Sequence, residues 1–261
     1  MSEYQDPVEF NRNAWDRMAL QGDRFYRAVT QAEIEEARNG SLVIRLTPTK
    51  PVPPQWLGTV AGKRILCLAS GGARQAPLLA AAGAEVVVFD LSEQQLARDQ
   101  EVAEQAQLKL VTIAGDMRDL GCFDDREFDL IVSPCATCFC PAVQPIWDEC
   151  FRVLRDGGKL MTGFINPLHY IFDAVELYRN RFVVRHKIPY SDLVLDPETK
   201  KQLSGPDRPL EFGHSLDSLI GGQLEAGFLL VGFFDDHWGG GDPLSKRIAT
   251  FAATLVEKPT G

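Results

Sequence analysis

The stretch RILCLASGGARQAPLLAAAGAEVVVFDLS, residues 64–92, predicts a strand, a glycine-containing turn, a helix and a second strand, in that order. Its two apolar runs, 65–69 and 86–89, show no polar alternation, which is typical of parallel strands buried on both faces. Residues 74–82 are rich in alanine and leucine and predict the crossover helix. Asp90 follows the second run, where open α/β sheets bind ligands, and its carboxylate can accept hydrogen bonds from both hydroxyls of a ribose. The stretch therefore predicts a βαβ unit that binds a nucleotide-bearing cofactor.

The turn of this unit separates two classes of cofactor. Gly71 and Gly72 allow a sharp turn and a close approach to a ligand, because glycine tolerates positive φ and has no Cβ. The dinucleotide fingerprint G-x-G-x-x-G needs a third glycine, which packs the helix against the strand. Residues 73–77, ARQAP, hold no glycine at that place. A nicotinamide-dependent oxidoreductase on a Rossmann sheet is therefore an alternative that the turn argues against.

The turn resembles motif I of the class I S-adenosylmethionine (SAM)-dependent methyltransferases, D/E-x-G-x-G-x-G. The marked positions are occupied here by Cys67, Ala69, Gly71 and Ala73. Later blocks resemble the family's motifs in order and spacing, namely Asp90, 115–117 (GDM), 128–134 (FDLIVSP) and 154–160 (LRDGGKL). The resemblance implies an α/β fold with a Rossmann-like, seven-stranded, mostly parallel sheet, an antiparallel last strand and helices on both faces.

Segments outside these motifs resemble one subgroup of the family. Residues 10–16 (FNRNAWD) and 47–51 (TPTKP) look like a subgroup of small bacterial methyltransferases that lack an assigned substrate. The same subgroup is resembled by 189–193 (PYSDL), 211–216 (EFGHSL) and 220–223 (IGGQ). The likeness spans nearly the whole chain, and it implies methyl transfer without naming the methyl acceptor.

The resemblance also implies a set of cofactor-binding residues. Asp90 is expected to hold the ribose, Asp116 the exocyclic amine of adenine, and Met117 the face of the adenine ring. Lys50, with Trp15 and Asn13, is expected to close over the methionine end; a solvated lysine and a packing tryptophan are the alternative. The expected SAM-binding residues are Ala69, Ser70, Gly71, Gly72, Asp90, Leu91, Asp116, Met117, Ser133, Trp15 and Lys50.

The N-terminal part is expected to form a helical cap and linker over residues 1–56. Residues 7–39 favour helices, and Thr30 with Glu33 is a capping-box signature. A short strand is predicted at 42–46. The proline-rich segment that follows is stiff, because each proline fixes its own φ and restricts its predecessor. It either holds the cap over the cofactor or serves as a plain linker.

The SAM-binding methyltransferase domain is expected to span residues 57–261. Hydrophobic patterning predicts strands at 64–69, 85–90, 109–113, 128–133, 158–164, 228–235 and 248–256, and helices at 74–82, 93–105, 142–154 and 215–226. Residues 166–213 show no such regular strand or helix pattern and contain many prolines and aromatics. Long irregular segments in compact domains are often functional. We interpret 166–213 as a substrate lid inserted into the domain.

Cys135, Cys138 and Cys140 form a cluster directly after the fourth core strand. Zinc sites usually pair C-x2-C with a second pair or with histidines, and no second C-x2-C exists in the chain. The cluster is therefore expected to line the methyl-acceptor pocket, and no metal is expected. Metalloid methylation, as in arsenite methyltransferases, is a minor alternative because that family's cysteine arrangement is not present.

The acceptor side offers two candidate catalytic residues, His214 and Tyr170. Histidine is the side chain best suited to removing a proton near neutral pH. Both residues lie in or beside the expected lid, as do His169 and Tyr190. A capping or packing role for His214 is the competing interpretation.

Composition limits the partners. The chain has 261 residues, and 27 Lys and Arg against 36 Asp and Glu leave a net charge of −9, without a basic stripe that would favour nucleic acid. The N-terminus is polar and acidic, no apolar run suggests a membrane span, and the 6 cysteines form no disulfide framework. We expect a cytoplasmic protein acting on a small molecule. A SAM-binding sensor without transferase activity is the alternative function, and no motif indicates an oligomeric state.

Overall fold

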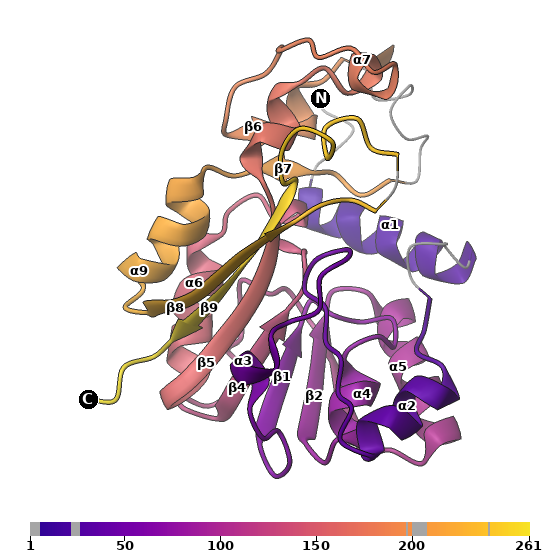
Figure 1. Ribbon diagram of the computed structural model, residues 1–261, viewed down its shortest axis with the longest axis vertical. Helices are drawn as coiled ribbons and strands as arrows, with labels where there is room; N and C mark the ends of the chain where they lie inside the picture. The colour runs from indigo at the N-terminus through magenta and orange to yellow at the C-terminus, as the bar shows by residue number, and fades with distance from the viewer. Residues whose placement is uncertain (1–5, 22–26, 197, 200–207, 240) are drawn as a thin grey trace.

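The computed structural model describes residues 6–21, 27–196, 198–199, 208–239 and 241–261. Its centre is a seven-stranded sheet of order β3-β2-β1-β4-β5-β9-β8 (Figure 1). The strands are β1 (Arg64–Leu68), β2 (Glu85–Asp90), β3 (Leu110–Ala114), β4 (Phe128–Ser133), β5 (Leu154–Ile165), β8 (Leu229–Asp236) and β9 (Phe251–Glu257). The first five run parallel, and β9 is antiparallel to both β5 and β8. This confirms the expected fold class.

Helices cover both faces of the sheet (Figure 1). The α-helices of the described residues include α1 (Pro7–Gln21), α2 (Gln31–Arg38), α3 (Pro54–Leu57), α4 (Ala76–Ala81), α5 (Glu93–Ala106), α6 (Gln144–Val153), α7 (Ala174–Tyr178) and α9 (Gly222–Glu225), of which α7 lies beyond the carboxyl end of the sheet. Alternate residues of β1 enter two separate cores, with Ile65 and Cys67 on one side and Leu66 and Leu68 on the other. Apolar side chains on both faces of one strand explain why the sequence shows no alternation. None of the described helices is long and apolar enough to cross a bilayer.

One predicted helical region is confirmed, and two predicted elements differ from the structure. The helical pattern of 7–39 comprises α1 and α2, with residues 22–26 outside the described part, and the capping box of Thr30 and Glu33 at the start of α2 is confirmed. The predicted strand at 42–46 is wrong, because its backbone bonds to groups outside any sheet. The predicted helix at 215–226 begins as a π-helical turn, Asp217–Gly221, before α9.

The segment 42–52 crosses the carboxyl ends of the central strands instead of joining the sheet. The amide side chain of Gln75 bonds to both the N–H and the C=O of Arg45. The Leu46 carbonyl accepts a bond from the Cys135 N–H (3.2 Å). It lies so close to β5 that a Cβ on Gly163 would fall 2.2 Å from the Leu46 oxygen. The crossing therefore requires glycine at 163.

The described residues of the segment 166–213, here called the lid segment, lie with α1 at the carboxyl end of the sheet (Figure 1). Its described parts contain two 3-10 turns (Pro167–Ile171 and Asp192–Val194), α7, and the short strands β6 (Tyr190–Ser191) and β7 (Phe212–Gly213). The two short strands pair antiparallel with each other and not with the main sheet. Residues 197 and 200–207 of the segment fall outside the described part.

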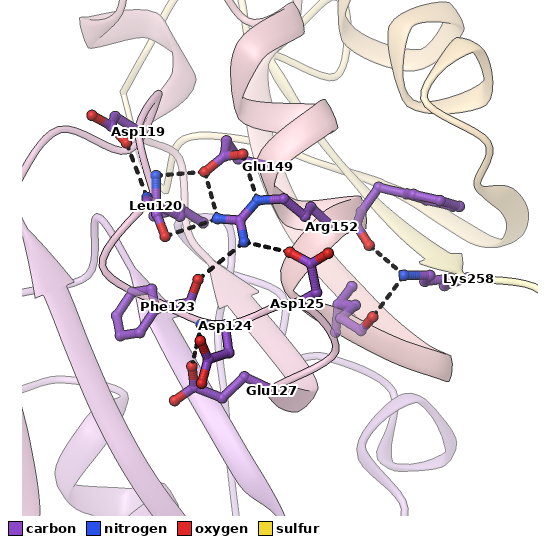
Figure 2. Close-up of polar contacts among 12 residues, drawn as sticks. Asp119, Leu120, Phe123, Asp124, Asp125, Glu127, Glu149, Arg152 and Lys258 are labelled. Atoms are coloured by element: carbon purple, nitrogen blue, oxygen red, sulfur yellow. Dashed lines mark hydrogen bonds and ion pairs between the residues drawn. The ribbon is translucent and has the colours of Figure 1, made fainter.

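At the opposite end of the sheet, Arg152 of α6 joins α6 to the loop before β4 (Figure 2). Its guanidinium donates to both carboxylate oxygens of Glu149, to Asp125, and to the carbonyls of Leu120 and Phe123, at 2.8 to 3.0 Å. These bonds engage every donor of the guanidinium fork. This charged cluster is therefore structural and holds the β4 entry loop in place.

Candidate cofactor and acceptor site

The strand order reverses between β1 and β4, and such switch points bind ligands beyond the carboxyl ends of the strands. The turn after β1 lies there. Ala69 and Ala73 occupy motif glycine positions, and their φ values of 47° and 58° are in the left-handed region. That region costs a non-glycine residue about 1–2 kcal/mol. The turn therefore adopts a backbone suited to glycine although two of its three motif glycines are alanines.

The middle of the turn excludes side chains. A Cβ on Gly71 would lie 2.8 Å from the Cβ of Gln95, and one on Gly72 would lie 2.7 Å from Gln95 Oε1. Ser70 is buried, and its hydroxyl has no partner among the described residues. A buried hydroxyl without a partner costs free energy unless a ligand or water meets it. The turn therefore fits a bound polar group such as SAM.

Asp90 stands at the tip of β2, beside the turn. One carboxylate oxygen accepts from the Gly71 N–H (2.8 Å) and the other from the Ser92 N–H (2.9 Å). Burial raises the pKa of Asp90 above its ordinary value, while the backbone bonds from Ser92 and Gly71 oppose that shift. Each oxygen has capacity for a second donor, which is what a ribose diol would supply.

Helix α1 fixes the segment that follows Asp90. Asp16 Oδ1 accepts from the Ser92 hydroxyl (2.6 Å) and from the Gln94 N–H (3.2 Å). Ser92 in turn caps α5, accepting from the Gln95 N–H (3.1 Å). Leu91, between these anchors, is half-buried. The N-terminal helix therefore forms part of the wall of this site.

The remaining expected cofactor residues lie in different settings. Asp116 pairs with Arg118, whose guanidinium nitrogens lie 2.6 to 3.1 Å from the carboxylate oxygens. Met117 is partly buried against a core cluster, and Ser133 is buried at the tip of β4. Arg118 was missed by sequence reasoning, and its pairing with Asp116 raises the arginine's pKa. An adenine amine would share the Asp116 carboxylate with Arg118.

Lys50 and Trp15 lie apart in the structure. The Lys50 ammonium lies 3.4 Å from Asp235 Oδ1, on edge strand β8, four positions from β1 in the sheet. Trp15 meets Phe139 edge to face, with ring centroids 4.8 Å apart. Asn13 is exposed. Lys50 would have to leave Asp235 to reach a cofactor at the turn, so its role stays a prediction.

His214 lies between the lid segment and the loop after β4. Its Nε2 is 3.1 Å from the Thr137 carbonyl and 2.9 Å from the Cys140 carbonyl. Both are acceptors, so Nε2 carries the proton and Nδ1 keeps a free lone pair. Burial lowers the pKa of His214 below its usual value, against the opposing effect of the two carbonyls. The ring is therefore neutral near pH 7 and can accept a proton only at Nδ1.

Tyr170 belongs to a buried polar network in the lid segment. Its hydroxyl donates to Glu211 Oε2 (3.0 Å), and its ring stacks on Tyr190 with centroids 5.1 Å apart. The Tyr190 hydroxyl donates to Asp192 (2.6 Å), and Arg208 forms an ion pair with Glu211. Burial raises the pKa of Tyr170 far above its usual value. Tyr170 therefore stays protonated and serves as a hydrogen-bond donor.

The three clustered cysteines are thiols. Burial raises the pKa of Cys135 and Cys138 strongly, and that of Cys140 to about 11. The Cys140 thiol donates to the Ala142 carbonyl (3.0 Å). Within the described residues, no group of three or more Asp, Glu, His or Cys could hold a metal ion.

Asn11 of α1 is a residue of this site that sequence reasoning missed. It is fully buried, and its amide donates to the carbonyls of Phe139 (2.9 Å) and Leu210 (3.0 Å). Its Oδ1 accepts from the Leu210 N–H (2.7 Å). One side chain thus joins the N-terminal helix, the loop after β4 and the lid segment. Its place one helical turn before Trp15, on an otherwise apolar face, was the available signal.

These features define a class of protein, the Rossmann-like methyltransferases, and comparisons with known proteins agree. A family model described as a methyltransferase domain matches residues 66–162. The uncharacterised methyltransferase YbaJ of Bacillus subtilis is 44% identical over 252 residues, covering 96% of this chain and 98% of YbaJ. The chain belongs to the class I SAM-dependent methyltransferase family, and its cofactor is SAM.

Solved structures show the same fold at low sequence identity. A SAM-dependent methyltransferase of Methanosarcina mazei has a TM-score of 0.62 at 18% identity, covering 82% of this chain and 100% of that one. The 1,6-didemethyltoxoflavin N1-methyltransferase of Burkholderia thailandensis has a TM-score of 0.59 at 13% identity, covering 99% and 93%. These likenesses show the same fold.

Proposed function

We propose that this methyltransferase moves the methyl group of SAM to a small molecule held between the lid segment and the tips of β1, β4 and β5. The observation that supports it most is the position of His214, which bonds to the loop after β4 and follows the last lid strand directly. The carboxyl ends of β1 and β2 would hold the cofactor through the turn 69–72, Asp90 and Asp116. The cap and the lid segment would then select the acceptor.

The lid segment itself holds a cavity of about 150 Å³. Its lining includes Tyr170, Tyr190, His186 and Glu211, but neither His214 nor a residue of the cofactor turn. The cavity therefore supports a role for the lid segment in holding part of a small molecule.

Bound SAM supplies an activated methyl group that is transferred by in-line displacement. The chain's own task is to hold two reactants in line and to exclude water, which can contribute several kcal/mol. His214 Nδ1 would take the proton that the acceptor atom loses. The Tyr170 hydroxyl donates to Glu211, so Tyr170 would hold the lid segment in place and leave proton removal to His214.

The test is release of S-adenosylhomocysteine (SAH) from SAM and a fractionated metabolite extract, with labelled methyl tracing the product. His214→Gln keeps a side-chain amide N–H that can reach the two carbonyls, but it removes the base. We expect the turnover rate to fall about 10²-fold or more while SAH affinity stays within about twofold. Full activity in His214→Gln would contradict the assignment. SAM binding without turnover on any fraction would favour a sensor.

A further inference from the structure

A buried carboxylate lies directly beneath the cofactor turn. Asp99 of α5 is fully buried, and its Oδ2 accepts from the Gly72 N–H at 2.8 Å. A second backbone bond reaches it from Ala73. Gly72 and Ala73 have φ values of 99° and 58°, so Asp99 binds two of the three residues at which the turn is left-handed. The carboxyl group thus holds the backbone in the shape that the turn needs.

Asp99 supplies the acidic side chain that β1 lacks at the first position of the turn motif. The first marked position of the turn motif is an acid, but Cys67 stands there. Cys67 is buried in β1 within an apolar cluster, and burial raises the pKa of its thiol strongly. A neutral thiol is a weak partner for backbone N–H groups. The acceptor for the turn therefore comes from the next helix.

The surroundings of Asp99 favour its neutral form. The titratable groups that face it are Asp90 of β2 and Cys67 of β1, and neither brings a positive charge. Asp99 Oδ1 and Gln95 Oε1 are both buried acceptors without a partner among the described residues. The two side chains lie one helical turn apart and both meet Gly72. A proton on Oδ1 would turn one of two unsatisfied acceptors into a donor.

We propose that Asp99 is a positioning residue for SAM that holds the Gly72 and Ala73 N–H groups as a neutral carboxylic acid. The inference rests on the turn being the SAM site, as under Proposed function. Burial raises the pKa of Asp99 to about 7, with the charge of Asp90 adding to the shift. Ionisation would place a second buried carboxylate charge beside Asp90 and loosen the turn. SAM affinity would then fall as pH rises through 7.

The experiment measures SAH binding by calorimetry at about pH 6 and about pH 8, on either side of that pKa. In the wild type we expect affinity to fall about threefold or more at the higher pH. Asp99→Asn imitates the neutral acid, so its affinity should match the wild type at low pH and stay constant. Asp99→Ala leaves two buried N–H groups without an acceptor. Its SAH affinity should therefore be about tenfold or more below that of the wild type at both pH values.

Glu101→Gln is the matched control, since it removes one negative charge from an exposed position of the same helix. Its SAH affinity should change between pH 6 and pH 8 as that of the wild type does. If Asp99→Asn loses as much affinity as Asp99→Ala, or if wild type and Asp99→Asn show the same pH profile, the neutral-acid proposal is overturned. Wild-type affinity in Asp99→Ala would overturn the positioning role. Failure of the wild type to bind SAH would instead refute the cofactor site itself.

Thermal unfolding gives a readout that does not depend on the ligand. The pKa of Asp99 is raised in the fold from 3.8 to about 7, so the native state binds more protons and loses stability as pH rises across that window. We expect Asp99→Asn to melt higher than the wild type at pH 8 and to converge with it toward pH 4. A constant difference across this range would contradict the proposal.

Discussion

The proposed cofactor side of this molecule, the turn 69–73 with Asp90, and its proposed acceptor side, the lid segment with α1 and His214, are built in different ways. On the cofactor side, the turn 69–73 and Asp90 act through backbone dihedrals and N–H groups within one short stretch of chain. On the acceptor side, Asn11, Tyr170 and His214 act through side chains whose partners lie 41 to 199 positions away. A common cofactor suits a local backbone device, whereas a specific acceptor needs a surface assembled from distant segments.

The strongest test of the cofactor side is Asp90→Ala. It removes the acceptor for Gly71 and Ser92 together with the expected ribose partner. We expect SAH affinity to fall about 100-fold, equivalent to about 3 kcal/mol. Calorimetry measures this, with Glu85→Ala at the exposed opposite end of β2 as control. Equal affinity in the two variants would show that the turn binds without Asp90.

Asn11→Ala tests the acceptor side. It leaves the carbonyls of Phe139 and Leu210 and the Leu210 N–H without their partner. We expect about 2–3 kcal/mol of lost unfolding free energy, because these groups stay buried. Urea unfolding measures it, and Asn13→Ala on the exposed face of the same helix should change stability little. If α1 merely rested on the surface, the two variants would behave alike.

Asp236 anchors the segment that crosses the strand ends, accepting from the N–H groups of Thr49 (2.8 Å) and Lys50 (2.9 Å). Burial alone would raise its pKa, but a hydrogen bond from the Thr49 hydroxyl and the two backbone N–H bonds lower it from 3.8 to about 2. The lowered pKa means stability that is present above pH 4 and lost as pH falls toward 2. Asp236→Asn should therefore cost about 2 kcal/mol near pH 6 and progressively less below pH 4.

Urea unfolding across that pH range checks this dependence. The control is Asp235→Asn, whose side chain is 60% exposed. Its difference from the wild type should be small at every pH. If the loss of unfolding free energy in Asp236→Asn did not change with pH, the charge of the Asp236 carboxylate would make no contribution to stability.

The smallest expected effect returns to the cofactor turn. Ala69→Gly relieves the left-handed conformation at φ 47° and should stabilise the protein by about 1 kcal/mol. Differential scanning calorimetry should show a rise in Tm of about 2–4 °C. Ala97→Gly, at an exposed position inside α5, should move Tm the other way. A lowered Tm for Ala69→Gly would mean that the alanine methyl is needed for packing.

The sheet and the turn could be predicted because their signals are local. The apolar runs at 65–69 and 86–89 fill the positions of strands packed on both faces, and Asp90 ends the second one. The prediction at 42–46 failed because Leu-Val-Ile-Arg-Leu suits a strand, yet its hydrogen bonds go to Gln75, Val52 and Cys135. Local propensity does not report which partners the tertiary structure offers.

The roles of Asn11 and Asp99 could not be predicted because each is defined by its partners. Asn11 meets Leu210, which lies 199 positions away, and a buried asparagine in a helix has no signature of its own. Asp99 sits only 27 positions from Gly72, but nothing in the sequence of α5 tells a buried acid from an exposed one. His214 was found as a residue, whereas the tautomer that its two carbonyls impose required the structure.

The contact between Asn11 and Leu210 also has a consequence for the order of events during synthesis. α1 leaves the ribosome before its partner Leu210, which is made 199 residues later. At roughly 5–20 residues per second, α1 waits for about 10–40 s before that contact can form. During this interval the side-chain amide of Asn11 has no Leu210 backbone to bond to. The nascent chain therefore exposes to water, for that interval, an asparagine that the finished enzyme buries completely.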